Sequence, residues 1–189
     1  MFNISKQDVE TINRMVKIHL IDVGKNKLTI YTHKLYMDNA ELGRFKLQLF
    51  DDGVITINNK DRYVTVKGFH EGVAVFHHPH VWSTNNENPQ STAICLGDVG
   101  HTVRELIYSQ QEYAIAISVL LQFLEQGFGW STIKKETFLS FFPQVDKKQQ
   151  RIEFKQLVKE KEKQLKQIQE AKTTQEQKAA NELSALMGI

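Results

Sequence analysis

Residues 77–82, HHPHVW, and residues 94–98, ICLGD, frame the stretch that decides the fold of this 189-residue chain. Polar residues fill the interval between them, and residues 77–100 as a whole show neither helical nor strand periodicity. Four of the seven histidines lie between His70 and His80, and the single cysteine is Cys95. Because a loop of this length in a compact domain is usually functional or disordered, we take its reactive side chains as the candidates for chemistry.

The single cysteine near several histidines permits three interpretations. In the first, an imidazole or exposed backbone N–H groups favour the thiolate, which is a nucleophile. In the second, histidine and cysteine bind zinc, but the spacing matches no pair-and-pair zinc pattern. In the third, Cys95 is a small buried residue between the core-like Ile94 and Leu96. Spacing alone slightly favours this structural role, and we expect neither a metal nor a cofactor.

The chain before this stretch predicts one helix and then antiparallel strands. Ser5 and Asp8 have the spacing of a capping box, which places a helix start there. Short apolar runs then alternate with polar residues from about residue 16 to residue 75, and residues 51–53, DDG, are a hairpin signal. The pattern predicts an antiparallel meander of four to six strands.

The chain after this stretch predicts helices, so the sequence as a whole indicates the α+β class. Thr102 with Glu105 has capping-box spacing for a helix over residues 103–108, and Ser109 with Glu112 for a helix over residues 110–126. Gly127 can end the second helix. That helix is apolar on nearly all sides, which predicts a central core helix. An aromatic cluster follows over residues 138–142.

A charged segment ends the chain, and we expect a domain over residues 1–145 followed by a helical tail over residues 146–189. The tail carries 10 Lys+Arg and 7 Asp+Glu and has no Gly or Pro before Gly188. Apolar residues keep a 3.5-residue spacing for two heptads only, which is too short to indicate a coiled coil. A solvated helix is one interpretation, and a helix for docking or self-association through residues 146–186 is the other.

Composition limits the class of protein. Apolar residues make up 41 % of the chain and charged residues 24 %, which is typical of a globular protein. One cysteine allows no internal disulfide, and residues 1–10 lack the apolar core of a signal peptide, so we expect a cytoplasmic protein. No apolar run is long enough to cross a bilayer. The net charge of +2 and its distribution favour neither nucleic acid nor membrane as a partner.

The motifs resemble a known family. HPHV at residues 78–81, a polar loop, and ICLGD at residues 94–98 are similar to the active-site signature of ubiquitin-conjugating enzymes, and closest to their prokaryotic and phage relatives. The order of elements agrees with that family: a helix, an antiparallel meander, a His-Pro loop, the cysteine and then helices. The resemblance covers about residues 4–142 and implies the ubiquitin-conjugating fold with a C-terminal helical extension.

The resemblance implies a chemistry for individual residues. Cys95 accepts the C-terminus of a ubiquitin-like protein as a thioester, after an activating enzyme, and passes it to an amine. His80 stands where the family has its asparagine, so it donates an N–H to the oxyanion or acts as a base on the amine. Asp98 orients or deprotonates the amine, and His78 and Pro79 support the loop.

Departures from the family pattern keep a second function class open. His80 replaces the asparagine, the loop from His80 to Cys95 is longer than usual, and the proline-rich turn before the His-Pro motif is missing. The alternative is a catalytically silent interaction or assembly module, such as a phage or complex component, that docks through its C-terminal helix. A cysteine hydrolase is a distant third, because no Ser, Asp or Asn that could orient a base is identifiable.

Overall fold

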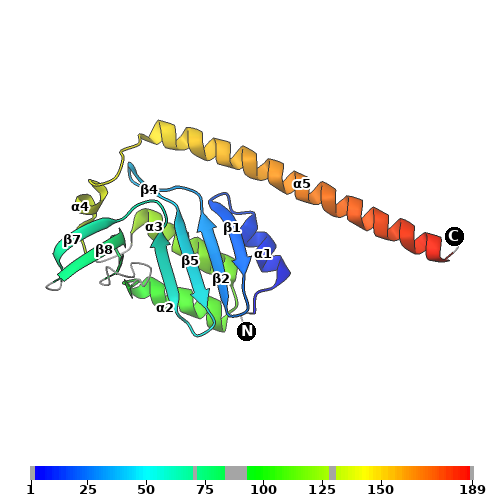
Figure 1. The fold of residues 1–189 in the computed structure, drawn as a ribbon, viewed down its shortest axis with the longest axis horizontal. Coiled ribbons are helices and arrows are strands. Elements are labelled where there is room, and N and C mark those ends of the chain that lie inside the picture. The colour runs from blue at the N-terminus through cyan, green and yellow to red at the C-terminus, as the bar shows by residue number, and fades with distance from the viewer. Residues whose placement is uncertain (1–2, 70–71, 84–92, 128–130, 188–189) are drawn as a thin grey trace. The chain divides into compact units, whose positions relative to one another are not determined.

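Blocks of antiparallel strand and of helix follow one another along the chain (Figure 1). A computed structural model describes residues 3–69, 72–83, 93–127 and 131–187. The chain divides into two compact units, Met1–Gln150 and Arg151–Ile189. The first unit holds the sheets and the shorter helices, and the second is formed by most of one long helix. The predicted α+β class with a C-terminal helical extension is confirmed.

The first sheet is formed by four antiparallel strands in the order β1-β2-β5-β6. Their bounds are β1 (Ile18–Val23), β2 (Lys27–Thr32), β5 (Phe45–Phe50) and β6 (Ile55–Asn59). Along β5, buried and half-buried residues alternate, because successive side chains of a strand point to opposite faces. The predicted hairpin at residues 51–53 joins β5 to β6, and Gly53 supplies the positive φ of 89° there.

A two-stranded sheet is inserted between β2 and β5 and holds the segment that leads to the long helix. It consists of β3 (Leu35–Met37) and β4 (Ala40–Gly43). Val145 N–H donates to Asn39 O at 2.6 Å, and Gln150 Nε2 donates to Asp38 O at 2.9 Å. Hydrogen bonds to the turn between β3 and β4 therefore hold residues 145–150, the last residues of the first unit, in place.

The second four-stranded sheet has the order β10-β9-β8-β7. Its strands are β7 (Val64–Phe69), β8 (Gly72–His78), β9 (Val81–Ser83) and β10 (Ala93–Ile94). The predicted antiparallel meander is confirmed in kind, but four to six strands is too few, since the described residues from Ile18 to His78 form eight strands, β1 to β8, in three sheets. The expectation that residues 77–100 lack regular structure is also wrong, except that residues 84–92 lie outside the described ranges. The strands β9 and β10 are too short to show a period.

The predicted helix starts agree with the structure at one place and differ at two. Helix α1 (Lys6–Asn13) follows Ser5, and the capping box of Ser5 and Asp8 is confirmed. The box predicted at Thr102 is wrong: helix α2 (Asp98–Arg104) begins after Gly97 and continues into the π-helical η1 (Glu105–Ser109). Thr102 lies inside α2, and its hydroxyl donates to Asp98 O at 3.3 Å. A hydroxyl can bond to the carbonyl four residues earlier, so spacing alone does not identify a cap.

Helix α3 (Tyr113–Gln126) is the central core helix, as its apolar character predicts. It begins after Glu112 rather than at residue 110, so the capping box predicted at Ser109 is also wrong. Helices α1 and α3 contact each other behind the first sheet (Figure 1). The helix ends at Gly127, which has a φ of 63° and donates its N–H to Phe123 O at 2.9 Å.

Two further helices complete the chain. The predicted aromatic cluster begins in helix α4 (Lys135–Leu139) and continues past its end, and the rings of Phe138 and Phe142 lie 4.7 Å apart. Helix α5 (Lys147–Met187) confirms the predicted helical tail. Apolar side chains on α5 are exposed at Ile152, Phe154, Ile168 and Leu183. None of the described helices is both long enough and apolar enough to span a membrane.

Candidate functional site

Antiparallel pairing of β9 and β10 brings the two sequence motifs together. Trp82 pairs with Ala93, and Val81 pairs with Ile94, so the residues just outside these pairs, His80 and Cys95, become neighbours. Cys95 N–H donates to His80 O at 2.9 Å. The two motifs are thus joined by the pairing of β9 with β10 and by this backbone hydrogen bond.

Cys95 lies at the surface, between strand β10 and the buried Leu96. The thiol is free and the residue is exposed, as a thiol that accepts a thioester requires, so the interpretation of Cys95 as a small buried residue is wrong. Leu96, the next residue, is buried at 6 % exposure, and Gly97 has a φ of 54° that a residue with a side chain rarely adopts. The chain then enters α2 at Asp98. Cys95 is therefore an exposed side chain on a backbone that is fixed on both sides.

The side chain of His80 points away from solvent. His80 is 2 % exposed, and its ring lies 5.2 Å from that of Phe123 and 5.6 Å from that of His78. Burial lowers the pKa of His80, and a hydrogen bond to the backbone of Cys95 acts in the opposite direction. His80 therefore contacts Cys95 through backbone groups of the cysteine.

His78 is fully buried beneath the same turn. Its Nδ1 accepts the N–H of His80 at 3.2 Å, while its Nε2 has no hydrogen-bond partner among the described residues. Burial, followed by the neighbouring His80, lowers the pKa of His78 to about 3, against a smaller opposing effect of the Leu124 backbone. His78 is therefore neutral at physiological pH and holds the turn as a hydrogen-bond acceptor.

The other two candidate residues lie on either side of this arrangement. Pro79 is buried, and its carbonyl accepts the N–H of Thr132 at 3.2 Å, which ties the turn to the segment before α4. Asp98 occupies the first turn of α2, three residues after Cys95, and is exposed. The structure thus places Pro79 in the support of the turn and Asp98 at the surface.

The sequence favours a surface position for His77 and His101 and a packing role for Trp82. A surface position for His77 is wrong: it is 1 % exposed, and its Nδ1 accepts the N–H of Asn59 at 3.1 Å. Trp82 packs against Phe76 with ring centroids 6.2 Å apart, as expected. The side chain of His101 is 87 % exposed, also as expected. A polar ring can be buried when a backbone group completes its hydrogen bond, and the sequence does not reveal this.

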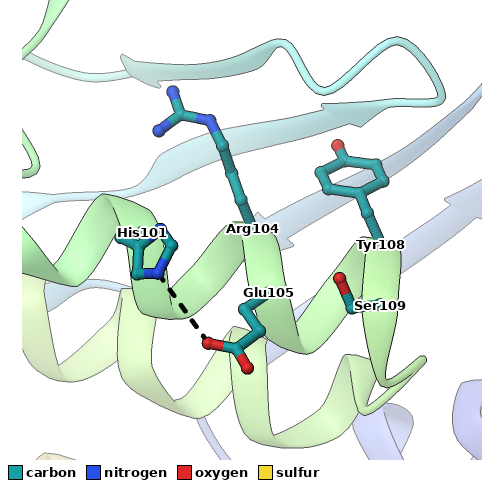
Figure 2. Close-up of a pocket in the computed structure, with 5 residues that line it drawn as sticks. All are labelled: His101, Arg104, Glu105, Tyr108 and Ser109. Carbon is teal, nitrogen blue, oxygen red and sulfur yellow. Dashed lines mark ion pairs between the residues drawn. The ribbon is translucent and has the colours of Figure 1, made fainter.

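A separate depression of about 440 Å³ lies on α2 and η1 and is not apparent from the sequence. It is lined by His101, Arg104, Glu105, Tyr108 and Ser109 (Figure 2). Arg104 and Tyr108 extend in the same direction from the helix, while His101 and Glu105 form an ion pair of 4.0 Å elsewhere on its surface. Burial and then Asp52 raise the pKa of Tyr108 to about 12. Charges of both signs meet here, so the depression favours no single class of ligand.

Metal binding is one of the interpretations of the cysteine and histidine residues. Within the described ranges, no group of three or more His, Cys, Asp or Glu side chains is placed to hold a metal ion. His78 and His80 instead stack on each other and contact Phe123 at tilted angles. The arrangement is that of an exposed cysteine whose backbone contacts one residue of a buried histidine pair.

Comparisons with known protein families, with curated proteins and with solved structures found no match to this chain. The resemblance to ubiquitin-conjugating enzymes therefore depends on the motifs at residues 78–81 and 94–98 and on the order of elements.

Proposed function

We propose that this chain is a ubiquitin-conjugating-like protein that carries a ubiquitin-like modifier as a thioester on Cys95. The observation that carries the proposal is an exposed thiol whose amide is bonded to His80 O at 2.9 Å. A nucleophile needs access to its substrate and a fixed position, and this residue has both.

The reaction has two steps. The Cys95 thiolate attacks the carbonyl carbon at the C-terminus of a modifier that an activating enzyme holds as a thioester. A carbon–sulfur bond to Cys95 forms, the carbon–sulfur bond to the activating enzyme breaks, and the sulfur of that enzyme leaves as a thiolate. An amine then attacks the same carbon, the carbon–nitrogen bond forms, Cys95 leaves as a thiolate, and the proton of the amine passes to a base.

The structure suggests how the neighbouring residues contribute. The exposed carboxylate of Asp98, three residues beyond Cys95, is the candidate that orients or deprotonates the amine. The buried ring of His80 acts as a positioning group, because it contacts the backbone of Cys95 and not solvent. His78 and Pro79 hold the turn on which His80 lies. The partners in this proposal are an activating enzyme and a ubiquitin-like protein in the cytoplasm.

Transfer from a chemical thioester tests the proposal without an activating enzyme. The probe is ubiquitin with a C-terminal mercaptoethanesulfonate thioester, added to the full chain at neutral pH and followed by intact mass. We expect an adduct that is lost on adding dithiothreitol, absent in Cys95→Ala and weaker in His80→Ala. An adduct that forms equally in Cys95→Ala would contradict the assignment of Cys95.

A second candidate function is favoured by α5. This helix displays Ile152, Phe154, Ile168 and Leu183 to solvent, with exposures of 42–59 %, which fits a docking or self-association segment in a catalytically silent module. Truncation after Gln150 tests it by sedimentation velocity. A full chain that sediments as an oligomer, beside a monomeric truncated chain, would support it. If both the full chain and the truncated chain sediment as monomers, self-association through α5 is excluded.

A further inference from the structure

A chain of two hydrogen bonds connects the buried histidines to Cys95. The His80 N–H donates to His78 Nδ1 at 3.2 Å, and the His80 carbonyl accepts the Cys95 N–H at 2.9 Å. His78 Nδ1 can accept only while it carries no proton, because both nitrogens of an imidazolium are donors. The position of the turn therefore depends on a neutral His78.

The surroundings of the two rings oppose an added proton. His78 is 0 % exposed and His80 is 2 % exposed. The rings stack with centroids 5.6 Å apart, and both lie against Phe123. His78 Nε2 and His80 Nδ1 have no hydrogen-bond partner within the described part of the chain. The Leu124 backbone favours the protonated form of His78, but burial opposes that form more strongly. A positive charge on either ring therefore destabilises the structure in which both rings are buried.

The charged groups around the rings act in the same direction as burial. Both His80 and the cationic Lys135 of α4 contribute to lowering the pKa of His78 to about 3. Lys135 itself pairs with Asp38 at 2.9 Å. The adjacent His77 uses its Nδ1 to accept the N–H of Asn59, and Gly127 lies against His80 from the end of α3. Among the described residues, no carboxylate contributes to the pKa of His78 or His80.

We propose that residues 78–80 form an acid-sensitive latch that holds the backbone of Cys95. Protonation of His78 removes the acceptor for the His80 amide and places a second donor opposite it. The backbone of the turn then moves away from His78, and the hydrogen bond from the Cys95 N–H to the His80 carbonyl breaks. The backbone at Cys95 becomes open to solvent while α3 stays folded. This device depends on the hydrogen bonds and the burial of the two rings, and it holds whether or not Cys95 forms a thioester.

Amide hydrogen exchange of the full chain, measured by NMR and corrected for the intrinsic rate, tests the latch. In the open state His78 regains an ordinary pKa of 6.5, against about 3 in the closed state. The opening equilibrium at the Cys95 amide therefore rises by about 30-fold between pH 7.5 and pH 5.0 through His78 alone. Protonation of His80 raises it further. The amide of Leu120 in the buried face of α3 reports global unfolding and should remain more protected than Cys95 at both pH values.

Two matched variants separate the latch from general acid sensitivity. His78→Asn keeps an acceptor near the position of Nδ1 and cannot titrate, and it should remove the His78 part of the pH dependence. Combining it with His80→Gln should leave the Cys95 protection constant across this range. His101→Gln, at an exposed histidine, should behave like the wild type. If the combined variant does not fold, the His78→Asn and wild-type profiles decide.

Three results would overturn the latch. One is a Cys95 protection that does not change with pH in the wild type. Another is a pH dependence in His78→Asn as large as that of the wild type. The third is an opening free energy at Cys95 equal to that at Leu120, because Cys95 would then open only when the whole chain unfolds.

Discussion

The two four-stranded sheets of this protein both bury apolar side chains, but the second also buries three histidines at one end. In the first sheet, β5 buries Phe45, Leu47 and Leu49 at alternate positions. In the second sheet, the end of β8 and the turn that follows it bury His77, His78 and His80. Apolar burial is independent of pH, whereas buried imidazoles are stable only while neutral. Apolar burial in both sheets therefore stabilises the protein at any pH, and the histidines of the second sheet couple the position of Cys95 to protonation.

The largest effect is expected from the first sheet. Leu47→Ala removes a fully buried side chain, and we expect it to lower the free energy of unfolding by about 2–5 kcal/mol. Gln48→Ala, on the half-buried face of the same strand, should cost under about 0.5 kcal/mol. Urea unfolding measures both. Equal costs would show that β5 does not separate a core face from a solvent face.

Acid should destabilise the protein through the second sheet. The pKa of His78 falls from 6.5 to about 3 on folding, so between these values the unfolded chain binds more protons. The stability is complete above pH 6.5 and is lost as the pH falls toward 3. Moving from pH 7.5 to pH 5.0 should therefore cost about 2 kcal/mol through His78. Denaturant titrations at both pH values, with His78→Asn as the control, give this difference, and an unchanged difference in the variant would refute the assignment.

The glycine beneath the histidines should matter through its backbone. Gly127 has a φ of 63°, and a Cβ there would lie 3.7 Å from His80 Nε2, an ordinary contact. We expect Gly127→Ala to cost about 1–2 kcal/mol, the strain of a left-handed residue. Gly24 does not have a positive φ, so Gly24→Ala should lower the free energy of unfolding by less than Gly127→Ala does. A larger loss at Gly24 in thermal unfolding would contradict this explanation.

The smallest expected difference compares two apparent capping boxes, one before the strands and one after them. Ser5→Ala removes a hydroxyl that accepts the N–H of Asp8 at 3.0 Å and should cost about 1 kcal/mol. Thr102→Ala, inside α2, should cost under about 0.5 kcal/mol. Thermal unfolding followed by circular dichroism compares the stability lost in the two variants. A greater loss in Thr102→Ala would indicate that a helix begins at Thr102, as the sequence predicts.

The sequence predicts the first sheet and the helices better than the second sheet. Several sequence patterns predict elements that the structure contains: the alternation in β5, the DDG turn, the apolar α3 and the charged α5. The strand β8 buries consecutive residues from Ala74 to His78, so no alternation marks it. Histidine is less often buried than apolar residues. The ring of His77 accepts the N–H of Asn59, and the rings of His78 and His80 lie against Phe123, so the fold brings together neighbours that are far apart in sequence.

The candidate site is predictable from the sequence only where local motifs determine it. The exposure of Cys95 and its closeness to His80 agree with the structure, because the motifs lie at the ends of one hairpin. The direction of the His80 ring could not be predicted, since it depends on Phe123 and Gly127, which are far away in sequence. The roles of Cys95, His80 and Asp98 in catalysis stay predictions.

The most direct test of the proposed thioester replaces sulfur with oxygen at the same position. Cys95→Ser, incubated with a ubiquitin thioester at mildly alkaline pH and analysed by intact mass, should accumulate an ester that resists dithiothreitol and is cleaved by hydroxylamine. Cys95→Ala is the matched control and should give no adduct. An adduct on the wild-type chain that maps to a lysine, with none at position 95 in either the wild type or Cys95→Ser, would contradict the account.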